Sequence, residues 1–440
     1  MVMSETKKDK QFFTVGGVFF LLIVIPLSLM AFLIANGMFK LGVTIKERAV
    51  NVLDQKSQEE IKIRAINTAE EVANFLNERK KDVLTATILP ANDIVYKQFL
   101  KESNKTIWIK DGKKIRLTSA PVYTEMSLID KTGRETIKIV NGHTMTADKL
   151  KNVSNSASTA YKMETYFAKT KDLNKGDVYV SPVTGWYVTK QEFEKGKSFS
   201  GVVRFATPVF GKEGFAGIIV LTLDYRHLAK YTNQVIPTQA DQVLKADAST
   251  GNYAYMIDSR GFVIVHPNDF HIGGLTKEGI PVQSLTEKTA SALMKNGEEV
   301  LNFNMMGYTD TNLPLIAKDA AAGNAGTKSY KFGGHTIFVA YAPIKFYAAS
   351  YPAPAGFGWV GMGIDVEKYN EAAIKASKSI DKEAKSWTAT IIFILIASMI
   401  ILFLIMWLLV RGINRSIQSE VPEGSQSPLA FDDDDEDDDK

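Results

Sequence analysis

The side chains most often used in catalysis and metal binding are few in this sequence and widely spaced. The chain has no cysteine, and its histidines are His143, His227, His266, His271 and His335. Only His266 and His271 are close, and their spacing would place them about 140° apart on a helix. The intervening Pro267-Asn268-Asp269 indicates a turn instead. We therefore expect His266 to cap the end of a hairpin rather than to bind a metal ion.

Sequence motifs of enzymes are not found either. No His-Glu-x-x-His, Gly-x-Ser-x-Gly or EF-hand pattern occurs. Gly196-Lys197-Ser198 resembles the end of a phosphate-binding loop, but Gln191 stands where the first glycine belongs, so we expect a polar loop. The lack of cysteine excludes disulfide scaffolds, thiolate metal sites and cysteine nucleophiles. We expect no enzymatic activity, no catalytic residue, no metal ion and no cofactor.

The overall charge conceals an asymmetry. Lys and Arg number 52 against 49 Asp and Glu, for a formal net charge of +3 over 440 residues. Residues 431–440 (FDDDDEDDDK) hold eight acids and one lysine, net −7, so residues 1–430 carry +3 + 7 = +10. With 45% apolar residues and no compositional bias, the rest of the chain is typical of globular protein.

Two segments without charge are long enough to cross a membrane. They are residues 11–39 and 386–410, and a span needs about 20 apolar residues. A cleaved signal peptide is the alternative for the first, but its apolar core is too long and no small-residue cleavage site follows closely. Pro26 would kink this helix, which a membrane span tolerates. Two spans place both termini on one side, and the basic residues outside them favour the cytoplasm.

The segment between the spans begins with a helical pattern. Over residues 41–89 an apolar stripe recurs at helical spacing, and Pro90 ends it. The stripe is formed by Ala65, Ala69, Val72, Leu76 and Val83. Hairpins are then expected at 123–140 and 201–225, with a helical segment and loops over 144–176 and a strand-like run at 177–183.

The same order of elements then recurs. Residues 253–267 repeat the Ile-Asp-x-x-Gly hairpin of 129–133, 335–344 repeat the strand before Pro208, and 356–369 repeat the closing strand with its short helix. The repeating segment is too long to be a solenoid repeat. It predicts two related α+β modules, each an antiparallel sheet with helices.

This order of motifs resembles the double CACHE extracytoplasmic sensor domains of bacterial chemoreceptors, sensor kinases and cyclases. The resemblance covers about residues 41–385. The matching segments are YF at 166–167, GDVYVSP at 176–182, RFATPVFGKEG at 204–214, GNYAYMIDSRGFVIVHP at 251–267, YAPI at 341–344 and FGWVGMGIDVEKY at 357–369.

The resemblance implies an α+β fold of two stacked, PAS-like antiparallel-sheet modules on a long N-terminal helix, flanked by two transmembrane helices. The expected parts are a cytoplasmic N-terminus (1–10), a first transmembrane helix (11–39), a stalk helix region (40–104), a membrane-distal module (105–235), a membrane-proximal module (236–370), a connecting helix (371–385), a second transmembrane helix (386–410) and a short HAMP-like start with an acidic tail (411–440).

The resemblance also implies where a ligand would bind. Amino-acid-sensing members hold the ligand carboxylate with an Arg-x-Trp-Tyr motif and its ammonium with an Asp late in the distal sheet. Here the motif aligns with Glu164-Thr165-Tyr166-Phe167, and the Asp position falls on Thr222. The remaining candidate ligand-binding residues are Tyr166, Phe167, Tyr179, Ser181, Arg204, Thr207 and Asp224.

Each candidate has a structural alternative. Arg204 could clamp a carboxylate ligand, since a guanidinium offers a fork of donors, or it could be an edge-strand or salt-bridging arginine. The aromatic residues could form the walls of a pocket or simply belong to the core.

The sequence leaves two readings of function open, with an enzyme the least supported. The first is a sensor of the bacterial inner membrane, a chemoreceptor-like homodimer with its large domain outside, which passes binding of a small molecule to a separate or missing signalling partner. The second is a scaffold that uses the same ectodomain for assembly, with the acidic tail recruiting a partner or ions. Nothing indicates nucleic-acid binding, and residues 411–440 leave no room for an output domain, so the chain could also be the front end of a larger receptor.

Overall fold

A computed structural model describes residues 21–34, 36–37, 40, 55–111, 114–240 and 243–420. The chain divides into two compact units, one of residues 53–371 and the other of residues 1–52 with 372–440. The predicted N-terminal segment 1–10, residues 11–20 and 41–54, and the acidic tail beyond residue 420 lie outside the described residues.

Of the two predicted spans, the second has a complete counterpart among the described residues. Helix α9 (Val366–Glu420) contains Lys385–Leu409, an apolar stretch long enough to cross a bilayer. The predicted connecting helix and HAMP-like start are parts of this same helix rather than separate elements. Only a shorter apolar helix, Leu21–Ile34, is described within the first predicted span, which stays a prediction.

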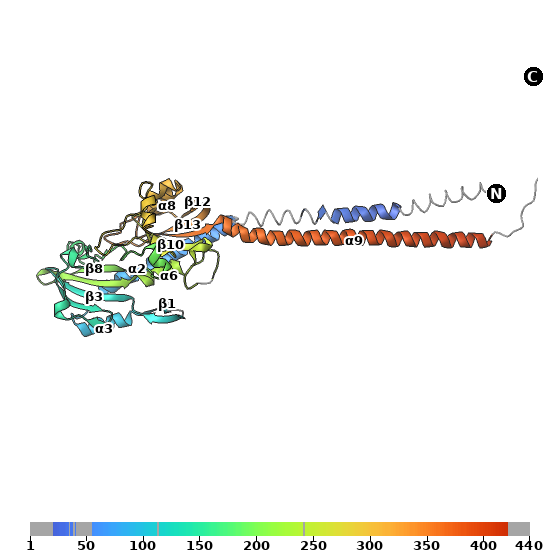
Figure 1. The fold of residues 1–440 in the computed structure, drawn as a ribbon. Helices are drawn as coiled ribbons and strands as arrows, with labels where there is room; N and C mark the ends of the chain where they lie inside the picture. Colours follow the sequence, from blue (N-terminus) through green and yellow to red (C-terminus); the bar gives the residue numbers. More distant parts are fainter. Residues whose placement is uncertain are drawn as a thin grey trace, which may run out of the picture. The chain divides into compact units, whose positions relative to one another are not determined.

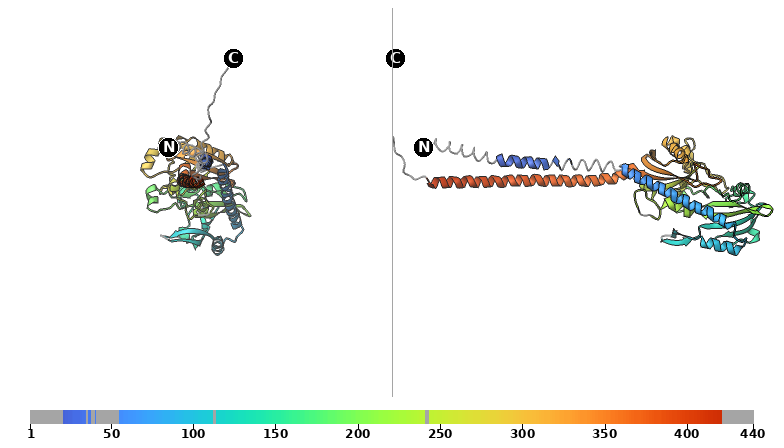
Figure 2. Two further views of the ribbon diagram at one scale, coloured as in Figure 1. Left: turned by 90° about the vertical axis from the view of Figure 1, so that its right-hand side faces the viewer. Right: turned by 180° about the vertical axis from the view of Figure 1, so that it is seen from behind.

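The N-terminal helix of the large unit follows its predicted stripe. Helix α2 (Gln55–Ala86) buries all five stripe residues, and it ends before Pro90 as expected. Helix α3 (Asp93–Glu102) follows, capped by the Asn92 side chain, which accepts a hydrogen bond from the Ile94 amide. α2 contacts strands of both sheets described below, so its buried face joins two separate sheets (Figure 2).

The first sheet lies in the predicted distal module. Its order is β5-β4-β3-β9-β8-β6, with β7 paired to β8. Its strands are β3 (Tyr123–Asp130), β4 (Glu135–Val140), β5 (His143–Thr144), β6 (Tyr179–Val180), β7 (Thr184–Gly185), β8 (Gly201–Gly211) and β9 (Gly214–Asp224). The predicted hairpins 123–140 and 201–225 are therefore confirmed as β3–β4 and β8–β9.

The second sheet lies in the predicted proximal module (Figure 1). Its order is β11-β10-β14-β13-β12, and its strands are β10 (Asn252–Asp258), β11 (Val263–Val265), β12 (Gly326–Phe332), β13 (His335–Ile344) and β14 (Gly358–Asp365). The other helices of the large unit are α4 (Tyr166–Thr170), α5 (Lys190–Glu194), α6 (Tyr225–Asn233), α7 (Ala290–Lys295) and α8 (Asn312–Ala321). Short 3-10 helices lie at Ala147–Lys149, Ser156–Ser158, Ala248–Thr250, Asp269–His271 and Phe303–Tyr308.

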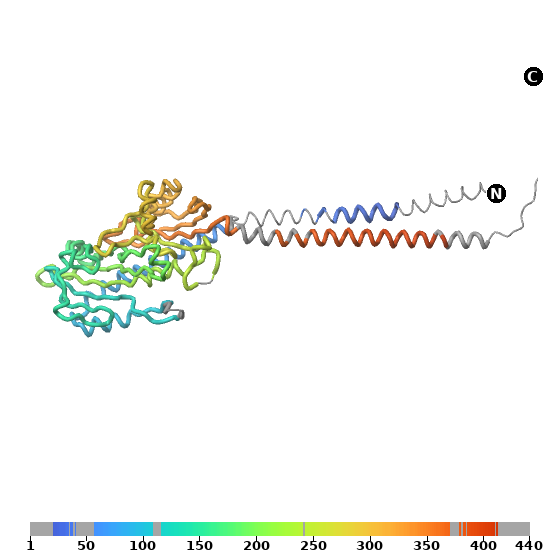
Figure 3. Tube along the Cα trace, in the orientation of Figure 1, coloured from blue at the N-terminus to red at the C-terminus, as the bar shows by residue number. Residues whose placement is uncertain are grey.

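The internal repeat seen in the sequence is confirmed in detail by the backbone. In each sheet the turn begins with an aspartate whose carboxylate accepts two backbone N–H groups: Asp130 from residues 132 and 134, and Asp258 from residues 260 and 262. Gly217 and Gly358 occupy the equivalent place opposite these aspartates, at φ +153° and +146°. A Cβ at either glycine would lie 2.0 Å from a carbonyl oxygen, so only glycine fits. The two sheets therefore share this turn and the glycine that faces it; the trace of both modules is drawn in Figure 3.

Alternation along the strands gives the distal sheet two different faces. Residues such as Val203, Phe205 and Leu221 belong to the hydrophobic cluster that includes α2. Ala206, Ile218 and Val220 belong to a second, smaller cluster with residues of α4. Of the predicted ligand residues, Tyr166 and Phe167 belong to this second cluster and Arg204 alternates in step with Ala206, whereas Thr207 alternates in step with Phe205 on the first face.

Two elements differ from the sequence prediction. Segment 144–176 contains two 3-10 turns and the five-residue α4, and is otherwise loop, because its hydrophobic residues follow no helical period. The hairpin of β1 (Lys105–Asp111) and β2 (Lys114–Ala120), which forms a separate two-stranded sheet, was not predicted. Its signal was present: the Asp111-Gly112 dipeptide between two runs rich in β-branched and aromatic residues favours a tight hairpin turn.

Candidate functional site

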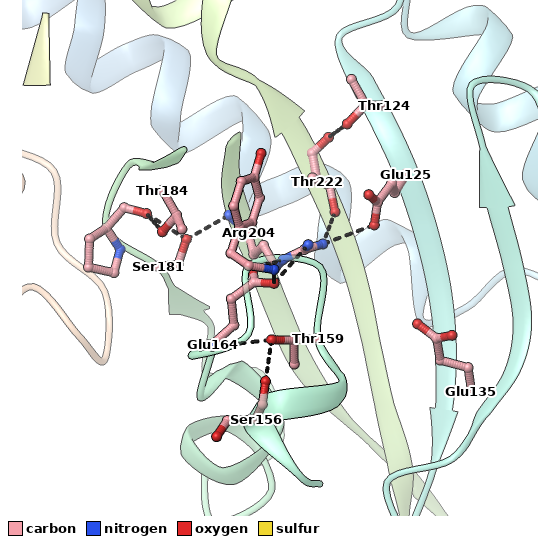
Figure 4. Close-up of polar contacts among 12 residues, drawn as sticks. Thr124, Glu125, Glu135, Ser156, Thr159, Glu164, Ser181, Thr184, Arg204 and Thr222 are labelled. Atoms are coloured by element: carbon pink, nitrogen blue, oxygen red, sulfur yellow. Dashed lines mark hydrogen bonds and ion pairs between the residues drawn. The ribbon is translucent and has the colours of Figure 1, made fainter. Parts of the chain in front are cut away.

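Arg204 lies in β8 at the centre of a group of charged side chains, with 3% of its surface exposed. All three guanidinium nitrogens donate hydrogen bonds. Nη1 donates to Glu125 Oε2 at 3.1 Å and to Thr222 Oγ1 at 2.7 Å, while Nη2 donates to Glu164 Oε2 at 3.2 Å and Nε donates to Glu164 Oε1. Figure 4 shows Glu164 and Glu125 approaching the guanidinium from opposite sides. The salt-bridging alternative for Arg204 is what the structure contains, although β8 is an interior strand and not an edge.

The ion pairs continue beyond Arg204. Lys138 Nζ, on β4, lies 2.7 Å from Glu135 Oε1 and 3.8 Å from Glu125 Oε2. Glu135 also accepts a hydrogen bond of 3.0 Å from the Lys151 amide. We call Glu125, Glu135, Lys138, Glu164 and Arg204 the distal charge cluster. Three carboxylates and two cations give it a net charge of −1 when all are ionised.

Burial and pairing act in opposite directions on the ionisation of these groups. Burial disfavours the charged form of Arg204, but Glu125 and Glu164 outweigh it, so the pKa of Arg204 is raised well above its usual value. Burial alone would raise the pKa of Glu125, yet Arg204 and then Lys138 outweigh that effect and the pKa of Glu125 is lowered. Arg204 and Glu125 therefore stay ionised, because the opposite charges beside them outweigh the effect of burial.

The aromatic candidates pack beside this cluster. Tyr166 and Phe167, both on α4, are buried in the second hydrophobic cluster, and Tyr179 of β6 is half-buried against it. The Tyr166 ring faces the Arg204 guanidinium, with 5.0 Å between Cζ and the ring centroid. Burial raises the pKa of Tyr166, so its hydroxyl stays neutral. The structure thus brings Tyr166 and Arg204 together.

The small polar candidates hold the backbone in place. Ser181 Oγ accepts a 2.9 Å hydrogen bond from the Arg204 amide and donates to the Pro182 carbonyl. Thr207 Oγ1 donates to the carbonyl of Asp177 at 2.7 Å. Asp224 caps α6 by accepting from the Arg226 amide, and its carboxylate is paired with the Arg226 guanidinium. Asp224 is therefore paired with Arg226, whereas Thr222 forms a hydrogen bond with Arg204.

Sequence reasoning missed the carboxylates of β3 and β4. Glu125 and Glu135 were not singled out, although each lies within a strand in which polar and apolar residues are mixed. A charged residue at an inward position of such a strand is the signal that could have identified them. Glu164 was noted only as a departure from the family motif. In the structure, its carboxylate accepts two hydrogen bonds from the Arg204 guanidinium.

The proximal module contains aromatic residues at the matching place. Tyr253 precedes Asp258 by five residues, as Glu125 precedes Asp130, and Tyr255 likewise corresponds to Ser127. Tyr255 packs against Phe303 and Trp359, with ring centroids 5.7 and 5.9 Å away. We call Tyr253, Tyr255, Phe303, Tyr330 and Trp359 the proximal aromatic cluster. A remaining void of about 20 Å³ has no room for an organic ligand.

The histidine prediction is confirmed for His266. Its Nδ1 accepts a 2.9 Å hydrogen bond from the Asn268 amide, which caps the turn after β11. Its ring contacts Tyr253 and His271, both at centroid distances of 4.9 Å. Among the described residues, His335, Asp365 and Glu367 bring possible metal-ligating atoms within 4.8 Å of one another. Asp365 is already 3.8 Å from the Lys368 ammonium, which supplies positive charge there.

Comparisons with known proteins found solved structures of sensor and chemoreceptor domains. No protein-family model and no curated protein matches this sequence. An extracellular domain assigned to the histidine kinase vpHK1S-Z8 matches at 14% identity and TM-score 0.43, covering 74% of this chain and 96% of that one. The ligand-binding domain of the Pseudomonas fluorescens chemoreceptor CtaA in complex with L-leucine matches at 12% identity and TM-score 0.40, covering 72% and 99%. The ligand-binding domain of Mlp24 with asparagine matches at 16% identity and TM-score 0.37, covering 75% and 98%.

Proposed function

We propose that this chain is a membrane-anchored, extracytoplasmic sensor of small molecules whose ligand binds at the distal charge cluster. The single observation that carries this proposal is the presence of buried ionised groups in the distal module. Burying charges costs free energy even when they are paired, and apolar side chains often replace such pairs without loss of stability. The proximal module has a similar sheet in which Tyr253 stands where Glu125 does and Val339 stands where Arg204 does, so this sheet does not require those two charges.

The geometry suggests how a ligand would enter. Glu164 lies in the loop before α4, and its carboxylate receives Arg204 in the bidentate manner that suits a carboxylate ligand. A ligand carboxylate would take the place of Glu164 on Arg204, while the freed Glu164 and Glu125 would remain to accept an amine. Glu164 thus acts as an internal substitute for the ligand, and Tyr166 forms a wall of the site.

Displacement of Glu164 would release contacts of its own loop. Glu164 Oε2 accepts a 3.2 Å hydrogen bond from the Tyr161 amide, and the Glu164 amide donates to Thr159 Oγ1. Movement of this loop would alter the packing of β8 and β9, which α2 also contacts. We propose that the change passes to α9 and across the inner membrane to a separate output partner in a homodimer. The ligand drives this change only through its different affinities for the two states.

The test uses the full chain in nanodiscs and a panel of carboxylates, amines, amino acids and purines. A specific ligand at 100 times its Kd should stabilise the chain by about 2.7 kcal/mol. Glu164→Ala should strengthen binding of a carboxylate ligand, and Arg204→Met should abolish it. Glu192→Ala, which removes an exposed carboxylate paired with Lys197, is the matched control. A ligand that binds equally well to all variants would place the site elsewhere.

The scaffold alternative is favoured by one observation. Arg204 and Tyr166 are packed and paired, and the described cavities do not include either residue. A panel that stabilises neither the native chain nor Glu164→Ala would support assembly as the function of the ectodomain.

A further inference from the structure

A cavity of about 400 Å³ lies away from the distal charge cluster. Its walls come from α2, from the β1–β2 hairpin, from α6 with the segment that follows it, and from Met362 of the proximal sheet. In Figure 1 these are the elements labelled α2, β1 and α6. The volume is in the range of small-molecule sites, which is roughly 300–1,000 Å³.

The cavity contains a cation without a counter-ion. Lys230, on α6, forms no ion pair with any described residue. Its Nζ lies 5.4 Å from the centroid of the Tyr231 ring. Burial, and then the nearby Lys105 and Arg79, lower the pKa of Lys230. An anion bound directly beside Lys230 would offset both effects, because an adjacent negative charge favours the protonated ammonium.

The wall formed by the β1–β2 hairpin offers an exposed apolar surface. Trp108 and Leu117 face each other across the β1–β2 ladder, with 43% and 56% of their surfaces exposed. Both line the cavity. An indole ring with a free face is well suited to stacking on a flat group.

Other lining residues define what else a ligand could contact. The Asn67 and Gln234 side chains, which line the cavity, form no hydrogen bond with other described residues. Glu71 also lines it and can accept a hydrogen bond from a ligand N–H or O–H group. The Arg64 guanidinium is already occupied, since it donates to the carbonyls of Ile236, Pro237 and Gln239. Lys230 is therefore the cation available to a ligand.

We propose that this cavity is a second ligand site, which binds a small organic anion carrying an aromatic group. The anionic end lies at Lys230 and the aromatic group lies against Trp108 and Leu117. Because α2, α6 and Met362 meet here, an occupant would contact elements of both modules and could bias how they pack.

The experiment uses the full chain in nanodiscs and 4-fluorophenylacetate as the probe, observed by fluorine NMR, with empty nanodiscs as the background. The matched neutral probe is 4-fluorophenylacetamide. We expect the anion to bind at least about tenfold more tightly than the amide, since a charge-assisted contact is lost in the amide. Lys230→Met should weaken binding of the anion by a similar factor, and Lys230→Arg should restore most of it. Lys318→Met changes an exposed lysine outside the cavity and should have no effect.

Several outcomes would overturn the proposal. They are no binding of the anion to the native chain, equal binding of anion and amide, and native-like binding by Lys230→Met. A thermal transition like that of the native chain would show that each variant is folded. Glu164→Ala separates this site from the distal charge cluster: it should leave probe binding unchanged, and a change would assign the probe to Arg204 instead. Trp108→Ala should weaken both probes equally.

Discussion

The two modules share a backbone design and differ in what they enclose. Both have the aspartate-headed turn and the glycine that faces it, yet the distal module encloses the distal charge cluster and the proximal module encloses the proximal aromatic cluster. The shared features are those that any chain following this path requires, because the turns and the close approach of two backbones depend on them. The enclosed residues differ between the two modules, so the shared backbone does not depend on them.

The two interiors also stabilise their modules in different ways. The aromatic cluster gains free energy from apolar burial, which has no direction and tolerates small movements. The charge cluster depends on directed hydrogen bonds and loses much when one partner leaves. A module with the second kind of interior is suited to respond to a ligand, and one with the first is suited to remain constant. The predictions below address this contrast, and native-state hydrogen exchange of the full chain lets each module act as a control for the other.

The largest effect is expected for Trp359→Ala. Trp359 is almost fully buried and contacts Phe303, Tyr255 and Tyr341. Its loss leaves a large cavity and should lower the opening free energy of the proximal sheet by about 4 kcal/mol. Exchange in β10 and β14 reports this, with β3 and β4 much less affected. A loss below about 1 kcal/mol would contradict the role of the aromatic cluster as the core of the module.

Arg204→Met should lower the opening free energy of the distal sheet by about 3 kcal/mol, because it leaves Glu125 and Glu164 buried without their cation. Replacing both glutamates by glutamine in the same chain should restore much of the loss. Lys197→Met removes one partner of an exposed ion pair and should cost less than about 1 kcal/mol. If Arg204→Met costs no more than this control, the charge cluster does not stabilise the module.

Gly217→Ala and Gly358→Ala test the shared backbone. Each introduces a Cβ at a carbonyl oxygen in a conformation that favours glycine, and each should cost about 2 kcal/mol in its own module. Gly142→Ala is the control, because Gly142 also has a positive φ (+81°) but open space around it, and it should cost only about 1 kcal/mol. If the two substitutions lower the opening free energy of their modules by clearly unequal amounts, the two modules are less alike than their backbones suggest.

The two modules should also differ in their response to pH. Burial lowers the pKa of both His266 and His271, so the folded proximal module binds protons less readily than the unfolded chain. Its stability should therefore fall as the pH drops below about 6.5, by at most about 1.4 kcal/mol per pH unit for each histidine. Glu125, whose pKa is lowered, stabilises the distal module above about pH 4.5, and this contribution is lost only as the pH falls further.

Exchange between pH 7 and 5 should thus rise in β11 and the turn after it, while β3 and β4 stay unchanged. Because burial also lowers the pKa of His227 on α6, local rather than global exchange is the appropriate measure. The double variant His266→Gln, His271→Gln should remove the response. A response that persists in this variant would assign it to another group.

Local patterns in the chain were sufficient to predict much of this architecture. The helical stripe of α2, the hairpins β3–β4 and β8–β9, and the recurrence of the Ile-Asp-x-x-Gly turn all depend on residues close together in sequence. Such patterns are read reliably because helix and strand periods are fixed by backbone geometry. The turn cap of His266 was also predictable, since its partner Asn268 is two residues away.

Only the tertiary structure decided what Arg204 contacts. Glu164 and Glu125 are 40 and 79 residues away in sequence, and they meet Arg204 because β3 and β8 both flank β9 while the loop before α4 folds over them. The cavity at Lys230 likewise forms where α2, α6 and the β1–β2 hairpin converge. No local period encodes such meetings. They depend on strand order and loop path, which set the partners of a buried charge.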